Sequence, residues 1–402
     1  MSEIEEIIRL AAKGDGITGS GRHVPGAVTG DQVSADGTVT HGRHHATPVC
    51  EHFGTCGGCQ LQHADEEVLR NFVRSRVVNA AKGQDVAIGE LLEEHLSPPE
   101  ARRRATLHAL RTKKGAMIGF REAGSHKIVD LRQCPVLRPE LTELIAPLRA
   151  FIAEHGPKGG VDIALSLSDQ GVDVALATFP LDGLGPTEGA LNFARDHGLA
   201  RLSIDQGFGP ETVWEPEPVT ITMSGVAVGL PVGAFLQATQ DAEELMVAIS
   251  REWLAGTRLV ADLFSGLGTF AFGLAQTGTP TRKILAAEAD QAAHLACKSA
   301  AARTNGKVIT IHRDLFRNPV TAEEIGKFDA ALLDPPRAGA KAQVAQIAES
   351  TLAKCLYVSC NPSSWARDAA VLTQAGFRLS KLKPVGQFRW STHVELVSLF
   401  ER

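Results

Sequence analysis

The C-terminal part of the chain alternates short apolar runs with segments of helical periodicity. The apolar runs are Leu259–Phe264, Ile284–Ala287, Val308–Ile311, Ala330–Leu333, Leu356–Ser359 and Leu396–Phe400. This alternation predicts repeated βαβ units, so residues 216–402 are expected to form a doubly wound, mostly parallel sheet. Ligands of such sheets bind at the carboxyl ends of the strands, and chemistry is therefore sought just after each run.

The preceding segments have other patterns. Residues 48–215 mix an expected amphipathic helix at Glu66–Lys82 with short strands such as Asp162–Leu167 and Val172–Ala177. Residues 1–47 carry β-favouring stretches such as Ile7–Leu10 and Val24–Val28 between closely spaced glycine turns, which predicts a small β-barrel. The expected fold is therefore α/β: a shortened barrel at 1–47, a central α/β domain at 48–215, and a Rossmann-like domain at 216–402.

Composition narrows the class of protein. The chain has 402 residues, of which 44% are hydrophobic and 22% charged, with a net charge of −5. These values exclude a disordered chain and a uniformly basic nucleic-acid coat. No apolar window reaches the ~18 residues of a membrane span. The acidic start, Met1–Glu6, is unlike a signal peptide, so a cytoplasmic protein is expected, whose seven cysteines indicate metal binding or catalysis and not disulfides.

The first apolar run ends in a glycine loop that begins with a carboxylate. Gly266 and Gly268 permit a tight turn and a close approach to a ligand, and alone they also fit a dinucleotide site. Asp262 would repel a pyrophosphate, whereas S-adenosylmethionine brings an ammonium and a sulfonium. This argues against a nicotinamide oxidoreductase, an alternative that a cofactor titration would test.

Two further acids follow the next runs in order. Glu288 is placed to accept the ribose hydroxyls of an adenosine, and Asp314 to read an adenine amino group. Each acid alone could be a solvated strand end. Three acids at successive strand ends favour an S-adenosylmethionine pocket.

The later strand ends carry a different chemistry. Asp334-Pro-Pro-Arg337 is a rigid loop without backbone donors at its prolines. Cys360 follows the fifth run, before a helix whose positive end is expected to favour a thiolate. Most single cysteines at such positions are small buried hydrophobes, but this one stands beside a methyl-donor pocket. Glu395 begins the last run and is expected to point into the same crevice.

The remaining cysteines and a basic stretch indicate further sites. Cys50, Cys56 and Cys59 lie within ten residues, and Cys134 can complete a fourfold set. Four thiolates suit a structural zinc or an iron–sulfur cluster, which spacing alone does not separate. Between Arg102 and Arg121 there are seven basic residues and no acid, typical of a phosphate-binding surface or of a solvated face.

Together these motifs resemble the RNA uracil-C5-methyltransferase family, in particular its iron–sulfur members acting on 23S ribosomal RNA. The resemblance covers nearly the whole chain, and residues 1–47 resemble a shortened TRAM domain. It implies a [4Fe-4S] cluster on the four cysteines, Cys360 as nucleophile, Glu395 as general base, and Asp334 at the reacting end of the cofactor. The S-adenosylmethionine site it implies comprises Gln237, Asp262, Phe264, Gly266, Gly268, Thr269, Glu288, Asp314 and Asp334.

The sequence also departs from this family pattern. Thr239, Ser265 and Thr269 replace residues that are usual near the cofactor, and Gln387–Trp390 replaces the usual Met-Phe-Pro approach to the base. The expected partner is a loop uridine of structured RNA, with 23S ribosomal RNA ahead of transfer RNA because the transfer-RNA branch generally lacks the four cysteines. The protein is expected to act as a monomer. An inactive iron–sulfur RNA-binding protein is the alternative from another class.

Overall fold

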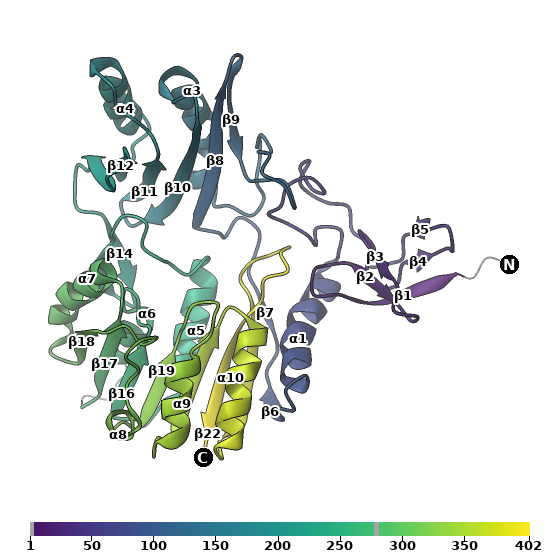
Figure 1. The fold of residues 1–402 in the computed structure, drawn as a ribbon, viewed down its shortest axis with the longest axis vertical. Coiled ribbons are helices and arrows are strands. Elements are labelled where there is room, and N and C mark those ends of the chain that lie inside the picture. Colours follow the sequence, from purple (N-terminus) through teal and green to yellow (C-terminus); the bar gives the residue numbers. More distant parts are fainter. Residues whose placement is uncertain (1–3, 277–280) are drawn as a thin grey trace.

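A computed structural model describes residues 4–276 and 281–402, so the acidic start Met1–Glu6 lies partly outside the described residues. Figure 1 shows a central domain above a larger sheet flanked by helices, with a small N-terminal sheet extending to one side. The helices of the described residues include none with the length and hydrophobicity needed to cross a bilayer.

The N-terminal unit is an antiparallel sheet in the order β3-β2-β1-β4-β5. Its strands are β1 (Glu5–Leu10), β2 (Gly16–Thr18), β3 (His23–Val24), β4 (Gln32–Val33) and β5 (Val39–Thr40). Ile7, Val24, Ala27 and Val33 form its small core. The expected β unit is confirmed, but the expected strand at Val24–Val28 is wrong after Val24, because the chain turns at Gly26, whose φ of 73° is left-handed.

The central domain is a six-stranded sheet in the order β13-β12-β11-β10-β8-β9. Its strands are β8 (Arg104–Thr112), β9 (Gly115–Gly119), β10 (Gly160–Ser168), β11 (Gly171–Ala177), β12 (Arg201–Asp205) and β13 (Pro210–Trp214). Its helices are α2 (Pro139–Glu143), α3 (Ile145–His155) and α4 (Leu184–Asp196). Phe151 of α3 stacks on Phe179 and on Phe193 of α4, which packs these helices together over the sheet.

All six predicted runs of the C-terminal part are strands of one sheet, ordered β18-β17-β16-β19-β20-β22-β21-β6. They are β16 (Leu259–Leu263), β17 (Lys283–Glu288), β18 (Val308–His312), β19 (Ala330–Leu333), β20 (Lys354–Ser359) and β22 (Glu395–Glu401). The first five are parallel, and β22 is antiparallel to β20. The doubly wound prediction is confirmed.

Three strands of this sheet were not expected. β21 (Arg378–Gly386) pairs with β22, and β6 (Ile88–Leu91) and β7 (His95–Leu96) pair in parallel with β21. The predicted helix Glu66–Lys82 is α1, which packs on β21 and α10. Residues 66–96 therefore complete the sheet of a domain that lies mostly at the other end of the chain (Figure 1).

Helices cover both faces of this sheet, and its two cores are separate. One face carries α5 (Gln240–Trp253), α6 (Thr269–Ala275), α7 (Gln291–Ala301) and the hairpin β14 (Thr220–Met223) and β15 (Val226–Gly229). The other carries α1, α8 (Ala322–Ile325), α9 (Lys341–Glu349) and α10 (Pro362–Gln374). The carboxyl ends of the parallel strands face the central domain (Figure 1), so the residues that follow these strands lie on the side of that domain.

Candidate active site

The loop after β16 requires glycine. Gly266 and Gly268 both have positive φ, of 53° and 96°, and Gly268 immediately precedes α6. A Cβ on Gly268 would lie 2.6 Å from the ring of Phe272 and 2.9 Å from Sγ of Cys297. The loop can therefore pass close to a ligand only with glycine at this position.

Asp262 is a buried acid that forms no ion pair with any residue that the structure describes. Its side chain is fully buried near the end of β16, and neither carboxylate oxygen has a hydrogen-bond partner among the residues that the structure describes. Burial raises its pKa to about 7. A buried carboxylate of this kind is stabilised by a cationic ligand, since an unpaired charge is costly to bury.

Glu288 lies at the end of β17 and is already held by the backbone. Its carboxylate accepts hydrogen bonds from the amides of Gly266 (2.8 Å), Ala289 (2.8 Å) and Asp290 (2.7 Å). Glu288 therefore fixes the glycine loop against the second strand. A carboxylate has about four acceptor positions, so Glu288 retains capacity to accept a further hydrogen bond.

The other expected cofactor residues are arranged around this loop. Asp314, after β18, accepts from the amides of Phe316 and Arg317 and so closes a local turn. Phe264 has a φ of 63°, and its ring lies 5.4 Å from that of Phe316. The hydroxyl of Thr269 is turned away from the strand ends, because it donates to Sδ of Met223 at 3.6 Å.

Asp334 and Gln237 come together from distant parts of the chain. Gln237, in the loop before α5, donates from Nε2 to Oδ2 of Asp334 at 3.1 Å. The carbonyl of Gln237 accepts from the buried Arg103, which also pairs with Glu243 at 2.5 Å. Burial raises the pKa of Asp334 well above its usual range, and Glu395, Asp262 and Glu288 add to the effect.

Cys360 directly follows β20, where Asn361 caps α10. Burial raises the pKa of its thiol to about 11; the charges of Glu395 and Asp334 add to this and Arg337 opposes it. In the ligand-free protein, burial beside two acids thus favours the neutral thiol, and the expectation that the positive end of the helix favours a thiolate stays a prediction.

Glu395 is the first residue of β22 and is 4% exposed. Burial raises its pKa to about 7, while a hydrogen bond from Gln387 and the charge of Arg104 lower it. Leu333 of β19 pairs with Tyr357 of β20, and Ser359 of β20 pairs with Leu396 of β22, so Asp334, Cys360 and Glu395 lie at the same edge of three neighbouring strands. The strand-end prediction thus brings Asp334, Cys360 and Glu395 together.

The Asp-Pro-Pro-Arg loop is fixed to α10. The carbonyl of Arg337 accepts from Nδ2 of Asn361 and from Oγ of Ser364, both at 3.0 Å. The Arg337 guanidinium lies 3.5 Å from Nδ1 of His393 at the mouth of the crevice. These bonds attach the loop to the start of α10, directly after Cys360.

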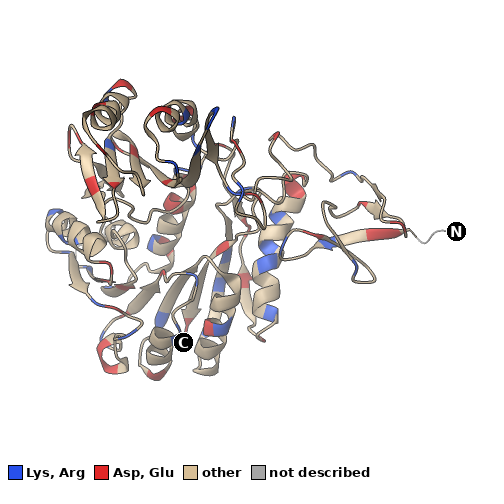
Figure 2. Cartoon of the chain, turned by 45° about the horizontal axis from the view of Figure 1, so that its top comes forward, with Lys and Arg blue, Asp and Glu red and all other residues tan. Residues whose placement is uncertain are grey.

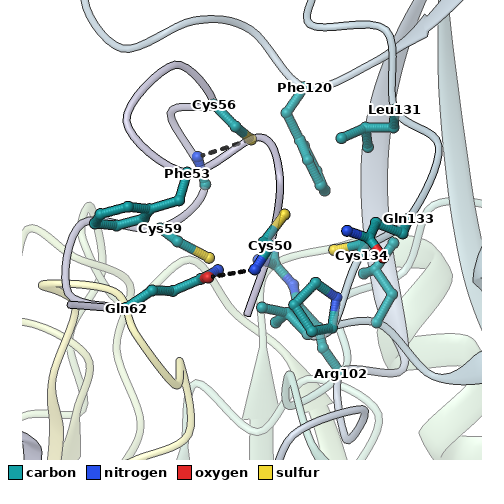
Figure 3. Close-up of a pocket in the computed structure, with 14 residues that line it drawn as sticks. Cys50, Phe53, Cys56, Cys59, Gln62, Arg102, Phe120, Leu131, Gln133 and Cys134 are labelled. Atoms are coloured by element: carbon teal, nitrogen blue, oxygen red, sulfur yellow. Dashed lines mark hydrogen bonds between the residues drawn. The ribbon is translucent and has the colours of Figure 1, made fainter. Parts of the chain in front are cut away.

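The four expected metal ligands lie around one cavity. Figure 3 shows Cys50, Cys56, Cys59 and Cys134 directed toward a common space, walled by Phe53, Phe120 and Leu131. Burial raises the pKa of Cys59 to about 12, and the other three thiols add to it. No group of three or more His, Cys, Asp or Glu in the described parts of the chain is arranged to hold a metal ion, so the cysteines share a cavity without forming a preassembled ligand set.

The basic stretch divides into two parts. Arg111 at the end of β8, Lys113 and Lys114 in the β8–β9 turn, and Arg121 after β9 are exposed. Figure 2 colours the cations of the chain blue. Arg103 is buried, and Arg102 and Arg104 are half-buried. The prediction of a phosphate-binding surface is therefore wrong for Arg103, which is buried and paired with Glu243, and stays a prediction for the other six cations.

The sequence reasoning missed two features of the crevice. Arg104 lies 4.5 Å over the ring of Phe235, which is 62% exposed at the mouth. Gln387, which differs from the family pattern, donates to Oε1 of Gln237 at 3.1 Å. The departure from the pattern was the available signal for Gln387, whereas no spacing rule links Arg104 to Phe235.

Comparison with known proteins agrees with this geometry. The tRNA (Uracil-5-)-methyltransferase family profile matches residues 230–402. An uncharacterised RNA methyltransferase of Zymomonas mobilis is 46% identical over 99% of this chain and 100% of its own length. The 23S rRNA (uracil(1939)-C(5))-methyltransferase RlmD of Salmonella paratyphi A is 32% identical over 89% of this chain and 82% of its own.

A solved structure supports the fold. The Pyrococcus abyssi tRNA (uracil-54, C5)-methyltransferase, in complex with S-adenosyl-L-homocysteine, aligns with a TM-score of 0.77 over 99% of both chains at 22% identity. The α/β methyltransferase fold with a small N-terminal β domain is thus shared at low sequence similarity. Taken with the relatives above, this shows that the chain belongs to the RNA uracil-C5-methyltransferase family of S-adenosylmethionine-dependent enzymes.

Proposed function

We propose that this enzyme methylates carbon 5 of a loop uridine in 23S ribosomal RNA through a covalent adduct on Cys360. The observation that supports the mechanism is the position of Asp334, Cys360 and Glu395 at the same edge of three neighbouring strands. The ribosomal target is supported by the 32% identity with the Salmonella 23S rRNA enzyme.

Cys360 begins the reaction. Carbon 5 of uracil is a weak nucleophile because its ring is electron-deficient, so the Cys360 sulfur adds to carbon 6 and makes carbon 5 an enolate carbon. Its thiol has a raised pKa, and its proton therefore has to leave to a neighbouring acceptor as the adduct forms. The methyl carbon of S-adenosylmethionine is then attacked in line, its bond to sulfur breaks, and S-adenosylhomocysteine is released.

Glu395 completes the reaction as the general base. It takes the proton of carbon 5, the electron pair of that bond forms the carbon 5–carbon 6 double bond, and Cys360 leaves as a thiolate. A pKa of about 7 suits a base that works near neutral pH. Asp334, held by Gln237, positions the uracil ring or the reacting end of the cofactor.

The acids of the first three strands form the proposed cofactor site. Asp262, unpaired and buried, is matched by the positive charges of S-adenosylmethionine. Glu288 and Asp314 flank the adenosine, with Phe264, Gly266 and Gly268 forming the loop below it. Thr269 and Gln237 complete the site that the family pattern implies, although the Thr269 hydroxyl is engaged with Met223.

The four cysteines are proposed to hold a [4Fe-4S] cluster. The donor set fits it, because four thiols of otherwise unbonded cysteines line one largely apolar cavity and Arg102 lines the same cavity. Bound there, the cluster would tie the Cys50–Cys59 loop to Cys134 of the central domain. We assign it a structural or RNA-positioning role, since it lies outside the crevice.

RNA binding is assigned to two surfaces. The N-terminal sheet is proposed to act as a shortened TRAM domain, and the exposed cations of the β8–β9 side are proposed to contact phosphates. The target uridine leaves its stack to reach Cys360, at a cost of a few kcal/mol that is smaller in a loop than in a duplex. We expect the enzyme to act in the cytoplasm as a monomer.

The test is methyl transfer from labelled S-adenosylmethionine to 23S rRNA fragments and to total transfer RNA, with the modified base mapped. We expect 5-methyluridine in a 23S fragment, and a loss of at least about 10³-fold in the Cys360→Ala variant, which should still bind S-adenosylmethionine. Methylation of transfer RNA alone would retain the chemistry and overturn the target. Full activity of Cys360→Ala would overturn the covalent mechanism.

A matched chemical trap isolates the nucleophile. In RNA with 5-fluorouridine at the target, carbon 5 carries no removable proton, so the adduct on Cys360 should persist and shift the enzyme on a denaturing gel. Cys355→Ala, which changes a buried cysteine in the same strand, should still form the adduct.

A further inference from the structure

Gln387 is bonded to Gln237 of the candidate site without belonging to the catalytic set above. It follows β21 in the loop that leads to Glu395, and it is only 2% exposed. Its Nε2 donates to Oε1 of Gln237 at 3.1 Å, and its Oε1 accepts from the amide of Thr239 at 3.4 Å. Both ends of this side-chain amide are therefore bound to the segment before α5.

Through Gln237, this amide reaches the acid of the next strand. Gln237 accepts from Gln387 with its oxygen and donates to Asp334 with its nitrogen at 3.1 Å. An amide has one acceptor end and one donor end, so Gln387 decides which way Gln237 is turned. Without that donor, the Gln237 amide loses the bond that presents its NH₂ group to Asp334.

Gln387 also acts on Glu395. Glu395 is paired across the sheet with Val385, two residues before Gln387, and a second hydrogen remains on Nε2 of Gln387 after its bond to Gln237. Donation from Gln387 lowers the pKa of the Glu395 carboxyl against the effect of burial. The other groups that act on Glu395 or are affected by it are Arg104, Asp334 and Cys360. Gln387 thus lies between the acid of β19 and the acid of β22.

The loop that carries Gln387 is braced from the N-terminal half of the chain. The carbonyl of Trp390 accepts from the amides of Gln60 (2.8 Å) and Leu61 (2.9 Å), and Arg389 pairs with Glu66 at 2.7 Å. The hydroxyls of Ser97 and Thr239 lie 3.0 Å apart beneath it. The position of Gln387 is consequently fixed before any substrate binds.

We propose that Gln387 is a positioning residue for methyl transfer, which orients Gln237 toward Asp334 and holds Glu395 in the geometry of a base. This role rests on the proposed function. Gln387 touches the residues that act on the uracil, and it acts through them. The residue class needed is an amide, because one side chain has to accept from Thr239 and donate to two oxygens.

The experiment compares Gln387→Met with the wild type on the methylated RNA fragment. Methionine has a similar length and no donor, so kcat should fall about 10- to 100-fold while the KM for RNA changes less than about threefold. Loss of the donor leaves Glu395 with a higher pKa, and a base has to be ionised. The acidic limb of the kcat profile should therefore move to higher pH, by about half to one unit.

Two further variants separate positioning from folding. Gln343 is a fully buried glutamine of α9 that bonds Val320 by both ends of its amide, so Gln343→Met is the same change in the same domain away from the crevice. It should lower the melting temperature without moving the acidic limb. Gln387→Asn keeps the amide on a shorter stem, and should recover part of kcat and part of the limb position.

The outcomes distinguish this inference from the function on which it rests. A wild-type enzyme that forms no 5-methyluridine would refute the proposed function. If the wild type is active, the positioning role would be refuted by a Gln387→Met variant whose acidic limb is unmoved and whose kcat lies within twofold of the wild type. If Gln387→Met does not fold, the Gln387→Asn variant takes its place. The positioning role would then be refuted if Gln387→Asn leaves the acidic limb of the kcat profile unmoved and loses no more kcat than Gln343→Met.

Discussion

The acidic crevice and the cysteine cavity both bury ionisable groups, yet they are built in opposite ways. Asp262 and Glu395 lie on rigid strand ends of one sheet, and burial raises the pKa of each to about 7. Cys50, Cys56 and Cys59 come from a loop, and Cys134 from the central domain. The acids need no ligand to be placed, whereas the thiols share a cavity in which no ligand set is preassembled among the described residues.

This difference implies opposite effects on stability. A preplaced, unpaired acid destabilises the empty fold and is stabilised by a cation that comes and goes. Thiols brought together from a loop and a separate domain would be stabilised by a resident metal cluster, whose binding free energy becomes folding free energy. Removing an acid should therefore stabilise the empty enzyme, and removing a cysteine should destabilise the loaded one.

The largest expected effect follows from Asp262→Asn. Replacing the carboxylate of Asp262 by a neutral amide should weaken binding of S-adenosylmethionine about 100-fold, or by about 2.7 kcal/mol. At pH 8 the same change should stabilise the ligand-free protein by about 1–3 kcal/mol, because the ionised buried acid is gone. Calorimetry and urea unfolding measure the two effects.

The sign of the stability effect depends on pH. The pKa of Asp262 is higher in the folded than in the unfolded chain, so the folded state binds the extra proton and loses stability as pH rises from about 4 to about 7. The gain from Asp262→Asn should thus fall to less than half at pH 5 and disappear below about pH 4. Asp368→Asn is the matched control, since buried Asp368 accepts from Tyr357 and Ala340 at 2.8 Å and its loss should destabilise at both pH values.

The second prediction concerns Cys134→Ser. We expect the purified variant to hold less than half the iron of the wild type, and to unfold several degrees lower, corresponding to about 2 kcal/mol. Iron analysis and thermal unfolding under exclusion of oxygen measure this. Cys297→Ser alters a buried cysteine of α7 and should leave the iron content unchanged. Wild-type protein prepared in this way without iron would refute the cluster.

The smallest expected effect is the pH dependence of cofactor affinity. With a pKa of about 7, Asp262 passes from mostly neutral at pH 6 to mostly ionised at pH 8, so the affinity for S-adenosylmethionine should rise by up to about tenfold across this range. S-adenosylhomocysteine has no sulfonium charge and should show a weaker dependence. A flat profile for S-adenosylmethionine would mean that Asp262 does not sense the charge of the ligand.

Residues at strand ends could be predicted from the sequence, whereas the buried cation Arg103 could not. The crevice residues follow apolar runs, and parallel strands bring their carboxyl ends together, so Asp262, Asp334 and Cys360 could be placed from periodicity alone. The role of Arg103 could not, because its partner Glu243 is 140 residues away and its charge resembles that of the exposed cations beside it.

The local hydrophobic pattern also did not predict the strands β21 and β6 at the edge of the sheet. β21 contains Lys381, Lys383 and Pro384, which interrupt its apolar alternation, and β6 has only four residues. Both are strands because of their neighbours: β21 lies between β22 and β6, and α1 packs over it. Tertiary contacts decide such segments, and a single sequence does not display them.

The position of β6 beside β21 has a consequence for synthesis of the protein. Residues 66–96 leave the ribosome first, but their partner strand ends at Gly386, 290 residues after Leu96. At about 5–20 residues per second, α1 and β6 wait on the order of tens of seconds before the sheet edge that receives them exists. During that interval the apolar side of α1 is without its final cover, and residues 216–402 expressed alone would lack α1 and the strands β6 and β7.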